Sequence, residues 1–160
     1  MRARLDDIDW KILSELQADG RMTNVELARR VGISAPPCLR RVRALEEAGF
    51  IRGYRALLDE RALGYEVVAF IEIRLKGQSE TDLIAFEAAL RNWPLVREAF
   101  MLSGEYDFLL KCVAPDLKSF QAFLVGEVSA APNVANSKTT LVLRASKAEP
   151  TVPLELPPAG

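Results

Sequence analysis

Up to about Tyr54, apolar residues recur at the three- and four-residue spacing that is typical of amphipathic helices. The pattern predicts two short helices at the start of the chain. The first is capped by Asp6 and ends near Gly20, and the second opens with Thr23 and Glu26, which match the S/T-x-x-E capping box. The residues predicted to face inward are Ile8, Ile12, Leu13, Leu16, Leu27, Ala28 and Val31.

A third helix is predicted from Ser34, whose hydroxyl is expected to cap the first turn, to Gly49. Two prolines fall within that first turn, where a missing N–H group is tolerated. Helical spacing predicts a buried arc made of Ala35, Cys38, Leu39, Val42 and Leu45. The opposite arc holds Pro36, Pro37, Arg40, Ala44 and Glu47, with Arg41 and Arg43 at its margins.

Three short helices with a glycine-containing turn between the last two are typical of a helix-turn-helix. The next stretch, "GFIRGYRALLD", predicts a glycine-punctuated strand pair, a wing that carries Arg52 and Arg55 along a phosphate backbone. From Arg21 to Arg55, eight arginines against three glutamates give +5, whereas the whole chain has a formal charge of −1. Such a basic segment is the usual footprint of a nucleic-acid contact, although a solvated helix face can look the same. The predicted DNA-contacting residues are Ser34, Pro36, Pro37, Arg40, Arg41, Arg43, Arg52 and Arg55.

From Glu60 onward the apolar pattern changes from helical to alternating. Strands are predicted over Tyr65–Leu75, on both sides of the turn Ser103-Gly104-Glu105, and over "SKTTLVLRAS"; helices are predicted over "ETDLIAFEAALRNW" and "DLKSFQAFLVGEV". The order βαββαβ is that of a ferredoxin-like domain. The predicted fold class is therefore α+β. Its parts are a winged helix-turn-helix over 1–58, a linker over 59–64, a ferredoxin-like domain over 65–147 and a proline-rich tail over 148–160.

Composition argues against catalysis. The chain has no histidine, no metal-ligand cluster and no phosphate-cradling glycine loop, so no enzyme activity and no cofactor are predicted. Cys38 and Cys112 lie far apart in sequence and are expected to be buried thiols. The longest apolar runs are strand-sized and no signal-peptide core follows Met1, so a cytoplasmic protein without a membrane segment is expected.

Four motifs in order give the chain a specific resemblance: "LDDIDWKIL", "ELARRVGIS", "LRRVRALEEAGFI" and "SGEYDF". Together they resemble the Lrp/AsnC family of bacterial transcription regulators, and the likeness runs to about Leu154. The resemblance implies a C-terminal domain of RAM type, homodimers that can assemble further into octamers, and a roughly palindromic site on double-stranded DNA. Two alternatives stay open: a sirohaem decarboxylase of similar fold, against which the lack of histidine counts, and an architectural DNA-binding protein without an effector.

The turn "SGEYDF" is the candidate small-molecule site. Read from its residues alone, it is a connection between two strands, exposed enough for Gly104 to take a positive φ, in which Asp107 accepts nearby backbone N–H groups. The resemblance implies instead an amino-acid effector pocket at a subunit interface, because an aspartate suits an ammonium group and hydroxyls suit a carboxylate. The residues implied are Gly104, Tyr106 and Asp107, and less directly Ser137, Thr139 and Thr140. The tail is expected to be extended, either as a frayed end or with "TVPLEL" packed along a neighbouring subunit.

Overall fold

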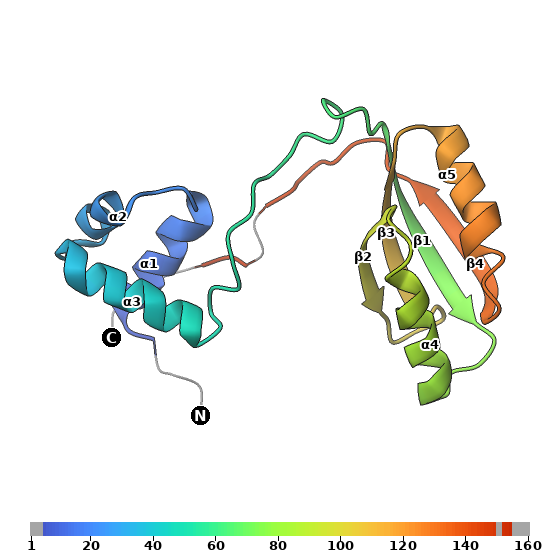
Figure 1. Cartoon of the computed structure of the whole chain (residues 1–160), viewed down its shortest axis with the longest axis horizontal. Coiled ribbons are helices and arrows are strands. Elements are labelled where there is room, and N and C mark those ends of the chain that lie inside the picture. Colours follow the sequence, from blue (N-terminus) through green and yellow to red (C-terminus); the bar gives the residue numbers. More distant parts are fainter. Residues whose placement is uncertain (1–4, 150–151, 155–160) are drawn as a thin grey trace. The chain divides into compact units, whose positions relative to one another are not determined.

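The computed structural model of the chain describes residues 5–149 and 152–154. It consists of two compact units, which are described separately here (Figure 1). One unit combines Met1–Leu57 with Lys147–Gly160, and the other spans Leu58–Ser146. The described residues 147–149 and 152–154 therefore belong to the N-terminal unit.

The N-terminal unit contains three helices: α1 (Asp7–Ala18), α2 (Asn24–Val31) and α3 (Ala35–Glu47). The predicted cap of α1 is confirmed, because the Asp6 side chain accepts the N–H groups of Ile8 and Asp9 while the Asp9 carboxylate accepts the N–H of Asp6. The predicted capping box of α2 is only half formed. Thr23 Oγ1 accepts the Glu26 N–H at 3.2 Å, but the Glu26 carboxylate binds two arginines rather than the backbone of Thr23.

The predicted hydrogen bond from the cap residue of α3 does not form. Ser34 stands at the N-cap position, but its hydroxyl makes no capping hydrogen bond. An N-cap side chain accepts the N–H of the second or third helical residue, and these residues are Pro36 and Pro37, which have none. The Ser34 hydroxyl is therefore left free at the exposed start of the helix. At the other end, Gly49 has a φ of 76° and the Phe50 N–H donates to the Leu45 carbonyl at 3.0 Å, closing the helix as expected.

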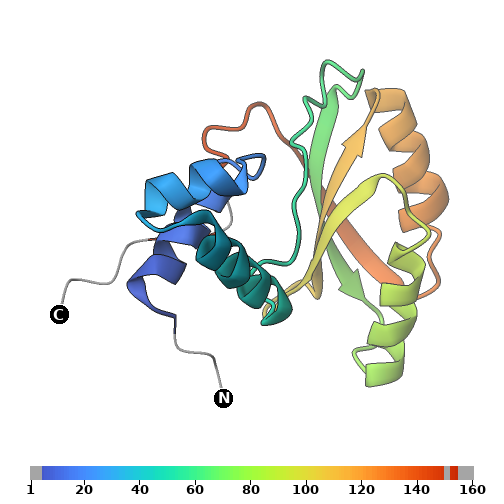
Figure 2. The ribbon, with the colours of Figure 1, turned by 60° about the vertical axis from the view of Figure 1, so that its left-hand side comes forward.

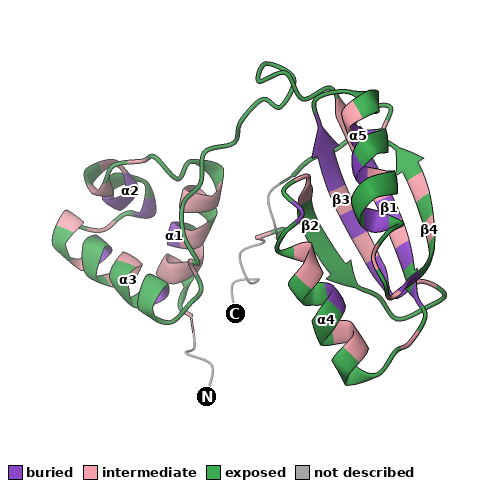
Figure 3. Ribbon diagram, turned by 45° about the vertical axis from the view of Figure 1, so that its right-hand side comes forward, coloured by how far each residue is buried: buried purple, intermediate pink, exposed green. Residues whose placement is uncertain are grey.

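The core of the N-terminal unit is formed by residues from all three helices (Figure 3). Its fully buried members are Ile12, Leu27, Ala28, Val31, Cys38 and Leu45. The prediction that Leu39 is buried is wrong, because 39% of this residue is exposed. The side of α3 that faces the core carries Ala35, Cys38, Val42 and Leu45, and Leu39 lies at its edge.

The predicted strand pair of the wing is also absent from the structure. Residues 51–59 have no regular secondary structure, although Ile51 packs against the core of the N-terminal unit. The side chain of Tyr54 links this segment to α3, because its hydroxyl donates to Glu46 Oε1 at 3.0 Å. Strand structure requires a second stretch of backbone in register. Among the described residues, "GFIRGYRALLD" finds no such partner.

The C-terminal unit has the predicted ferredoxin-like plan. Its elements are β1 (Val67–Leu75), α4 (Glu80–Leu90), β2 (Val96–Met101), β3 (Phe108–Ala114), α5 (Leu117–Phe123) continued by a π-helical turn η1 (Leu124–Val128), and β4 (Val134–Leu141). The strands form one antiparallel sheet in the order β2-β3-β1-β4, and α4 and α5 cover the same face of it (Figure 2).

The last strand lies earlier in the chain than predicted, because it begins at Val134 instead of Ser137 and ends at Leu141 instead of Ser146. Its end is set by its partner. The Val142 N–H donates to the Val68 carbonyl at 2.9 Å, and β1 starts only one residue before Val68, so no backbone remains for β4 to pair with.

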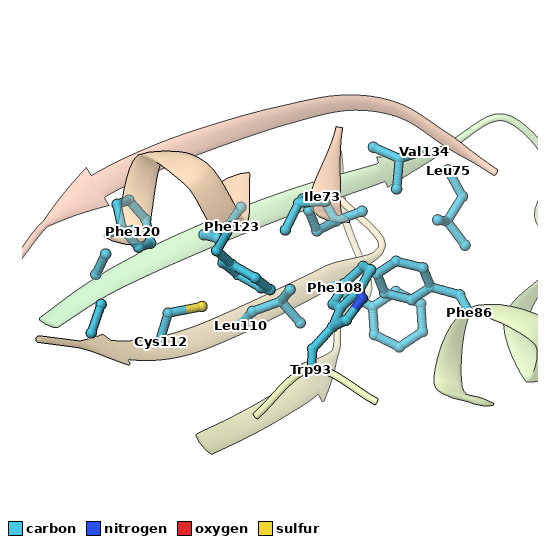
Figure 4. Packing of buried hydrophobic residues seen from close by; sticks show 14 residues of the cluster. Ile73, Leu75, Phe86, Trp93, Phe108, Leu110, Cys112, Phe120, Phe123 and Val134 are labelled. Atoms are coloured by element: carbon cyan, nitrogen blue, oxygen red, sulfur yellow. The ribbon is translucent and has the colours of Figure 1, made fainter. Parts of the chain in front are cut away.

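The core of the C-terminal unit lies between the sheet and its two helices. Alternate residues of β1, from Ala69 to Leu75, are buried on this side. The rings of Phe86, Trp93 and Phe108 gather at the level of α4 (Figure 4), with centroids 5.7 Å apart for Phe86 and Trp93 and 4.8 Å apart for Phe86 and Phe108. Edge-to-face and tilted pairs of this kind add to the stability given by burial. These aromatic rings therefore pack against the sheet that carries the candidate effector residues.

Candidate DNA-binding surface and effector site

Two arginines of α3 are free on its outer side. Arg40 and Arg43 are exposed, and no carboxylate of the described residues forms an ion pair with either. Pro36 is exposed beside them and Pro37 is half-buried. An unpaired guanidinium on an exposed helix face can bind a phosphate or the O6 and N7 atoms of a guanine.

Arg41, predicted to contact DNA, has partners within the chain. Its Nη1 atom lies 2.8 Å from Asp6 Oδ2 and 2.8 Å from Asp9 Oδ1, so it bridges α3 to the N-terminus of α1. The pKa of the Asp6 carboxyl lies below its ordinary value, first because of the hydrogen bond from the Asp9 N–H and then because of Arg41. Arg41 therefore links α3 to the start of α1 through two ion pairs, and its contact with DNA stays a prediction.

Two arginines of α2 are neutralised in the same way. Glu26 accepts hydrogen bonds from Arg29 and from Arg30, and Arg30 also binds Glu15 at 3.0 Å. These bonds, the ones from Arg29 first, lower the pKa of Glu26 to about 2. The positive charge available to a ligand is therefore concentrated on α3 and on the segment that follows it, where Arg52 and Arg55 are both exposed.

Acid is expected to destabilise the N-terminal unit through these carboxylates. Asp6 and Glu26 have lowered pKa values in the folded protein, so their stabilising contribution is complete above their ordinary values of 3.8 and 4.5. It is lost as the pH falls toward about 2, the pKa of Glu26 in the folded chain. Helix content followed by circular dichroism between pH 6 and pH 2 measures the loss. The variant Glu26→Gln should flatten the dependence, and an unchanged acid transition in that variant would contradict the role given to Glu26.

The candidate effector residues lie on two segments of the C-terminal unit. Gly104, Tyr106 and Asp107 belong to the connection of residues 102–107 between β2 and β3, whereas the three hydroxyl residues lie on β4. The end of β1 separates the two segments, because Ile73 pairs with Phe108 on one side and with Ser137 on the other. Both segments therefore reach the same end of the sheet with one strand between them.

The three hydroxyl residues of β4 do not share one face. Ser137 pairs with Ile73 and Thr139 pairs with Ile71, both of which point into the core under the helices. Thr140 pairs with Phe70, which points to the opposite side. Because residues directly opposite in a sheet project from the same face, a single small ligand on one face cannot contact all three.

Two expectations about the turn are corrected by the structure. Asp107, expected in an exposed turn, is only 8% exposed. Its Oδ2 atom accepts the Leu75 N–H at 2.7 Å, and its Oδ1 atom accepts Gln78 Nε2 at 2.7 Å. Gly104 has no positive φ, so the connection of residues 102–107 reverses the chain without a left-handed residue. Asp107 does accept a backbone N–H, but this group belongs to Leu75 on β1 and not to the turn, and its second partner is the side-chain amide of Gln78.

A polar cluster on the open face of the sheet could not be identified from the sequence. Lys138 Nζ lies 3.1 Å from Glu72 Oε2 on the neighbouring strand. The pKa of Lys138 is raised, first by its hydrogen bond to Glu72 and then by the nearby Tyr106 and Glu105. The cluster thus joins the turn to β4 across β1. Only knowledge of the strand register could have brought these residues together.

The remaining candidate chemistry is sparse. Cys38 and Cys112 are both buried, as predicted, and burial raises the pKa of the Cys112 thiol to about 12. In residues 5–149 and 152–154, no group of histidine, cysteine, aspartate and glutamate side chains could hold a metal ion. No helix in the same part of the chain is long and apolar enough to span a membrane.

Comparison with known proteins identifies both units. Residues 5–52 match the model of a winged helix-turn-helix DNA-binding domain, and residues 68–152 match the Lrp/AsnC ligand binding domain. The chain belongs to the Lrp/AsnC family. This Lrp/AsnC protein is therefore a DNA-binding transcription regulator with a ligand-binding domain, as the sequence predicted.

Its relatives match it over nearly the full length. The leucine-responsive regulatory protein of Rhizobium meliloti is 63% identical over 147 residues, which cover 92% of this chain and 94% of that protein. The protein of the same name from Escherichia coli K12 is 41% identical, covering 89% and 87%. Among solved structures, a transcriptional regulator of Neisseria meningitidis in complex with L-Met superposes with a TM-score of 0.90 at 38% identity, covering 94% and 97% of the chains.

Proposed function

We propose that this Lrp/AsnC regulator reads a roughly palindromic operator as a homodimer, with α3 as the reading helix, and that an amino acid bound at the C-terminal domain changes this binding. The observation that carries the proposal is the pair of exposed, unpaired arginines on α3, Arg40 and Arg43, in a unit of helix-turn-helix type. Arg40 stands next to the apolar Leu39 and faces away from the covered arc. It is the residue we expect to reach a base edge.

The other DNA contacts are expected to position the protein. Arg43, Arg52 and Arg55 suit phosphates, and the free hydroxyl of Ser34 can donate to a phosphate at the start of α3. Pro36 and Pro37 offer apolar contact only, since neither has a donor. Arg41 acts through its bridge to Asp6 and Asp9, which fixes the direction of α3.

The effector site is proposed at the end of the sheet where the turn and β4 meet β1. Gly104 offers open space, Tyr106 and Lys138 are neighbours, and Thr140 lies on the same open face as Lys138, whereas Ser137 and Thr139 lie on the other face and are not part of the proposed site. An amino acid fits this set because its carboxylate suits an ammonium group and hydroxyls. The complex of the Neisseria meningitidis regulator with L-Met supports an amino acid as the ligand class. Asp107 is assigned to holding the turn.

A homodimer is proposed from the apolar residues that the sheet leaves exposed. Phe100 and Met101 on β2 are 48% and 54% exposed. Leu102, which follows them in the chain, is also exposed, and so is Leu141 on the opposite edge strand β4. Exposed apolar side chains on the edge strands of a sheet favour association with a second chain. Octamers are the larger assembly implied by the family resemblance, and binding to chromosomal DNA places the regulator in the cytoplasm.

We also propose that the protein is not an enzyme, in keeping with relatives named as regulators. Purified protein mixed with sirohaem under anaerobic conditions should neither bind it tightly nor release a carboxylate from it, because the chain has no histidine to act as an axial ligand or proton donor. Absorption spectra measure the binding of sirohaem, and mass spectrometry of the products measures the loss of a carboxylate. Detectable turnover would overturn the proposal that this chain acts only as a regulator.

The proposed function as a whole is tested by selecting bound fragments from genomic DNA and screening the twenty amino acids by thermal shift. A palindromic motif, and an amino acid that both raises the melting temperature and changes operator affinity, are expected. Binding that ignores sequence and falls steeply with salt would identify an architectural protein instead.

A further inference from the structure

The N-terminal unit contains a pocket of about 690 Å³ whose walls come from three separate parts of the chain. One wall is α1, with Trp10, Leu13 and Leu16, and a second is the segment of residues 50–55. The third wall is formed by Val152 and Leu154 from the far end of the sequence. The C-terminal segment thus lines the same pocket as α1 and the segment of residues 50–55.

A specific hydrogen bond holds this segment in place. Gln17 Nε2, on α1, donates to the Val152 carbonyl at 2.7 Å, across 135 positions of sequence. Leu154 is half-buried although it lies close to the end of the chain. Apolar contact and a backbone acceptor together are how a peptide segment docks on a folded domain, so the contact has the character of intramolecular recognition.

The segment of residues 50–55 needs such support more than the helices do. Between residues 52 and 58, no backbone N–H donates to a protein acceptor within the described part of the chain. Ile51 and the bond from Tyr54 to Glu46 hold it from the inside. A stretch without its own ladder of hydrogen bonds opens easily unless neighbouring groups pack against it.

We propose that Val152–Leu154 is a built-in docking segment of the DNA-binding unit, which orders the backbone that carries Arg52 and Arg55 before DNA is bound. Ordering beforehand removes part of the entropy that binding would otherwise lose, and so strengthens the contact with phosphates. The docked segment follows β4 in the chain, so the ligand-binding domain is linked to the N-terminal unit both before β1 and after β4. The part concerning DNA rests on the proposed function, whereas the docking itself does not.

The test compares three variants with the wild-type chain: full-length Leu154→Asp, a chain that ends at Ser146, and full-length Leu143→Asp as the matched control. Leu143 lies on the connection to the tail and is 92% exposed, so the same substitution there removes no packing. Trypsin cleaves after arginine, so mass spectrometry of brief digests measures the opening of the segment at Arg52 and Arg55. Cleavage at these two arginines should be about five- to tenfold faster in the first two variants. A charge in the docking site, or loss of the docking segment, removes the packing that keeps residues 50–55 closed. The operator affinity of these two variants should fall by about five- to tenfold, and Leu143→Asp should behave as the wild type.

The two readouts separate the proposals. Wild-type cleavage rates in both Leu154→Asp and the shortened chain would overturn the docking role, whatever the DNA results. Faster cleavage with unchanged operator affinity would overturn the ordering of Arg52 and Arg55 for DNA. If the wild-type protein selects no operator, the proposed function fails while the digestion experiment still decides whether the segment docks.

Discussion

Replacing Asp107 by alanine is expected to lower the free energy of unfolding of the C-terminal unit by about 2 to 4 kcal/mol. The substitution leaves the Leu75 N–H without its acceptor at a buried site, and it frees the Gln78 side chain. A buried donor that loses its partner costs more than an average hydrogen bond contributes, and bonds to a charged acceptor are the stronger kind. The loss should therefore exceed that of an ordinary surface substitution.

Urea unfolding followed by tryptophan fluorescence measures this effect in one unit. Trp93 is buried in the core of the C-terminal unit, so a Trp10→Phe background leaves it as the only reporter. Asp107→Asn keeps one acceptor oxygen and should lose less stability than Asp107→Ala. Glu105→Ala, on the same turn but exposed, should change the free energy of unfolding by less than about 0.5 kcal/mol. If Asp107→Ala lowers the free energy of unfolding by less than about 1 kcal/mol but abolishes amino-acid binding, Asp107 contacts the ligand directly and the structural role given to it here is wrong.

The buried position of Asp107 changes how effector variants must be interpreted. Any substitution there alters the end of β1 and the turn that carries Tyr106, since its own N–H also donates to the Ile73 carbonyl at 2.8 Å. Weakened amino-acid binding in an Asp107 variant is thus the expected result of a distorted turn. Tyr106 and Lys138, which lie near each other on the open side, are the positions where a direct contact can be tested without this complication.

Much of the fold could be predicted because it is encoded in local patterns. The caps of α1 and α2, and the left-handed Gly32 and Gly49 that follow α2 and α3, depend on residues within a few positions of one another. The alternating pattern after Glu60 gave the order of strands and helices, and the rules for connecting them left the ferredoxin-like arrangement as the natural solution. These features depend on spacing alone.

The errors lie where distant residues decide the structure. The wing was predicted from its glycines, but whether a strand forms depends on a backbone partner elsewhere in the chain. The bridge from Arg41 to Asp6 spans 35 positions and could not be foreseen, although contact of Arg41 with DNA stays a prediction. Asp107 was placed in an exposed turn because its partner Leu75 lies 32 positions away. The cap at Ser34 is different, since it fails for a local reason that the two prolines already contained.

The proline-rich tail lies partly outside the described residues. The expected extended segment "TVPLEL" includes Thr151, Glu155 and Leu156, which lie outside the described residues. The part that is described contacts α1 of its own chain, which is neither of the two outcomes considered for it from the sequence. Packing of this segment against a neighbouring subunit stays a prediction.

Replacing Arg40 by alanine is expected to weaken operator binding by about 1 to 3 kcal/mol for each half-site while leaving the fold intact. The guanidinium is exposed and has no ion-pair partner among the described residues, so no intramolecular contact is lost. If it binds a guanine edge, the loss should be specific to operators that carry that base pair, and specificity at this position should relax. Arg43→Ala should instead weaken binding to all sequences and reduce the salt dependence by about one counterion, as a phosphate contact does.

Fluorescence anisotropy with the selected operator and with a scrambled duplex, over a range of salt concentrations, separates these two outcomes. Arg91→Ala is the matched control, because this exposed arginine lies in the C-terminal unit and its loss should leave DNA binding unchanged. Arg41→Ala provides the structural contrast: removing its bridge to Asp6 and Asp9 should lower both thermal stability and affinity, whereas Arg40→Ala should lower affinity alone. Unchanged operator affinity of Arg40→Ala at physiological salt would remove α3 from the reading role, and the arginines at residues 52 and 55 would then have to carry the contact.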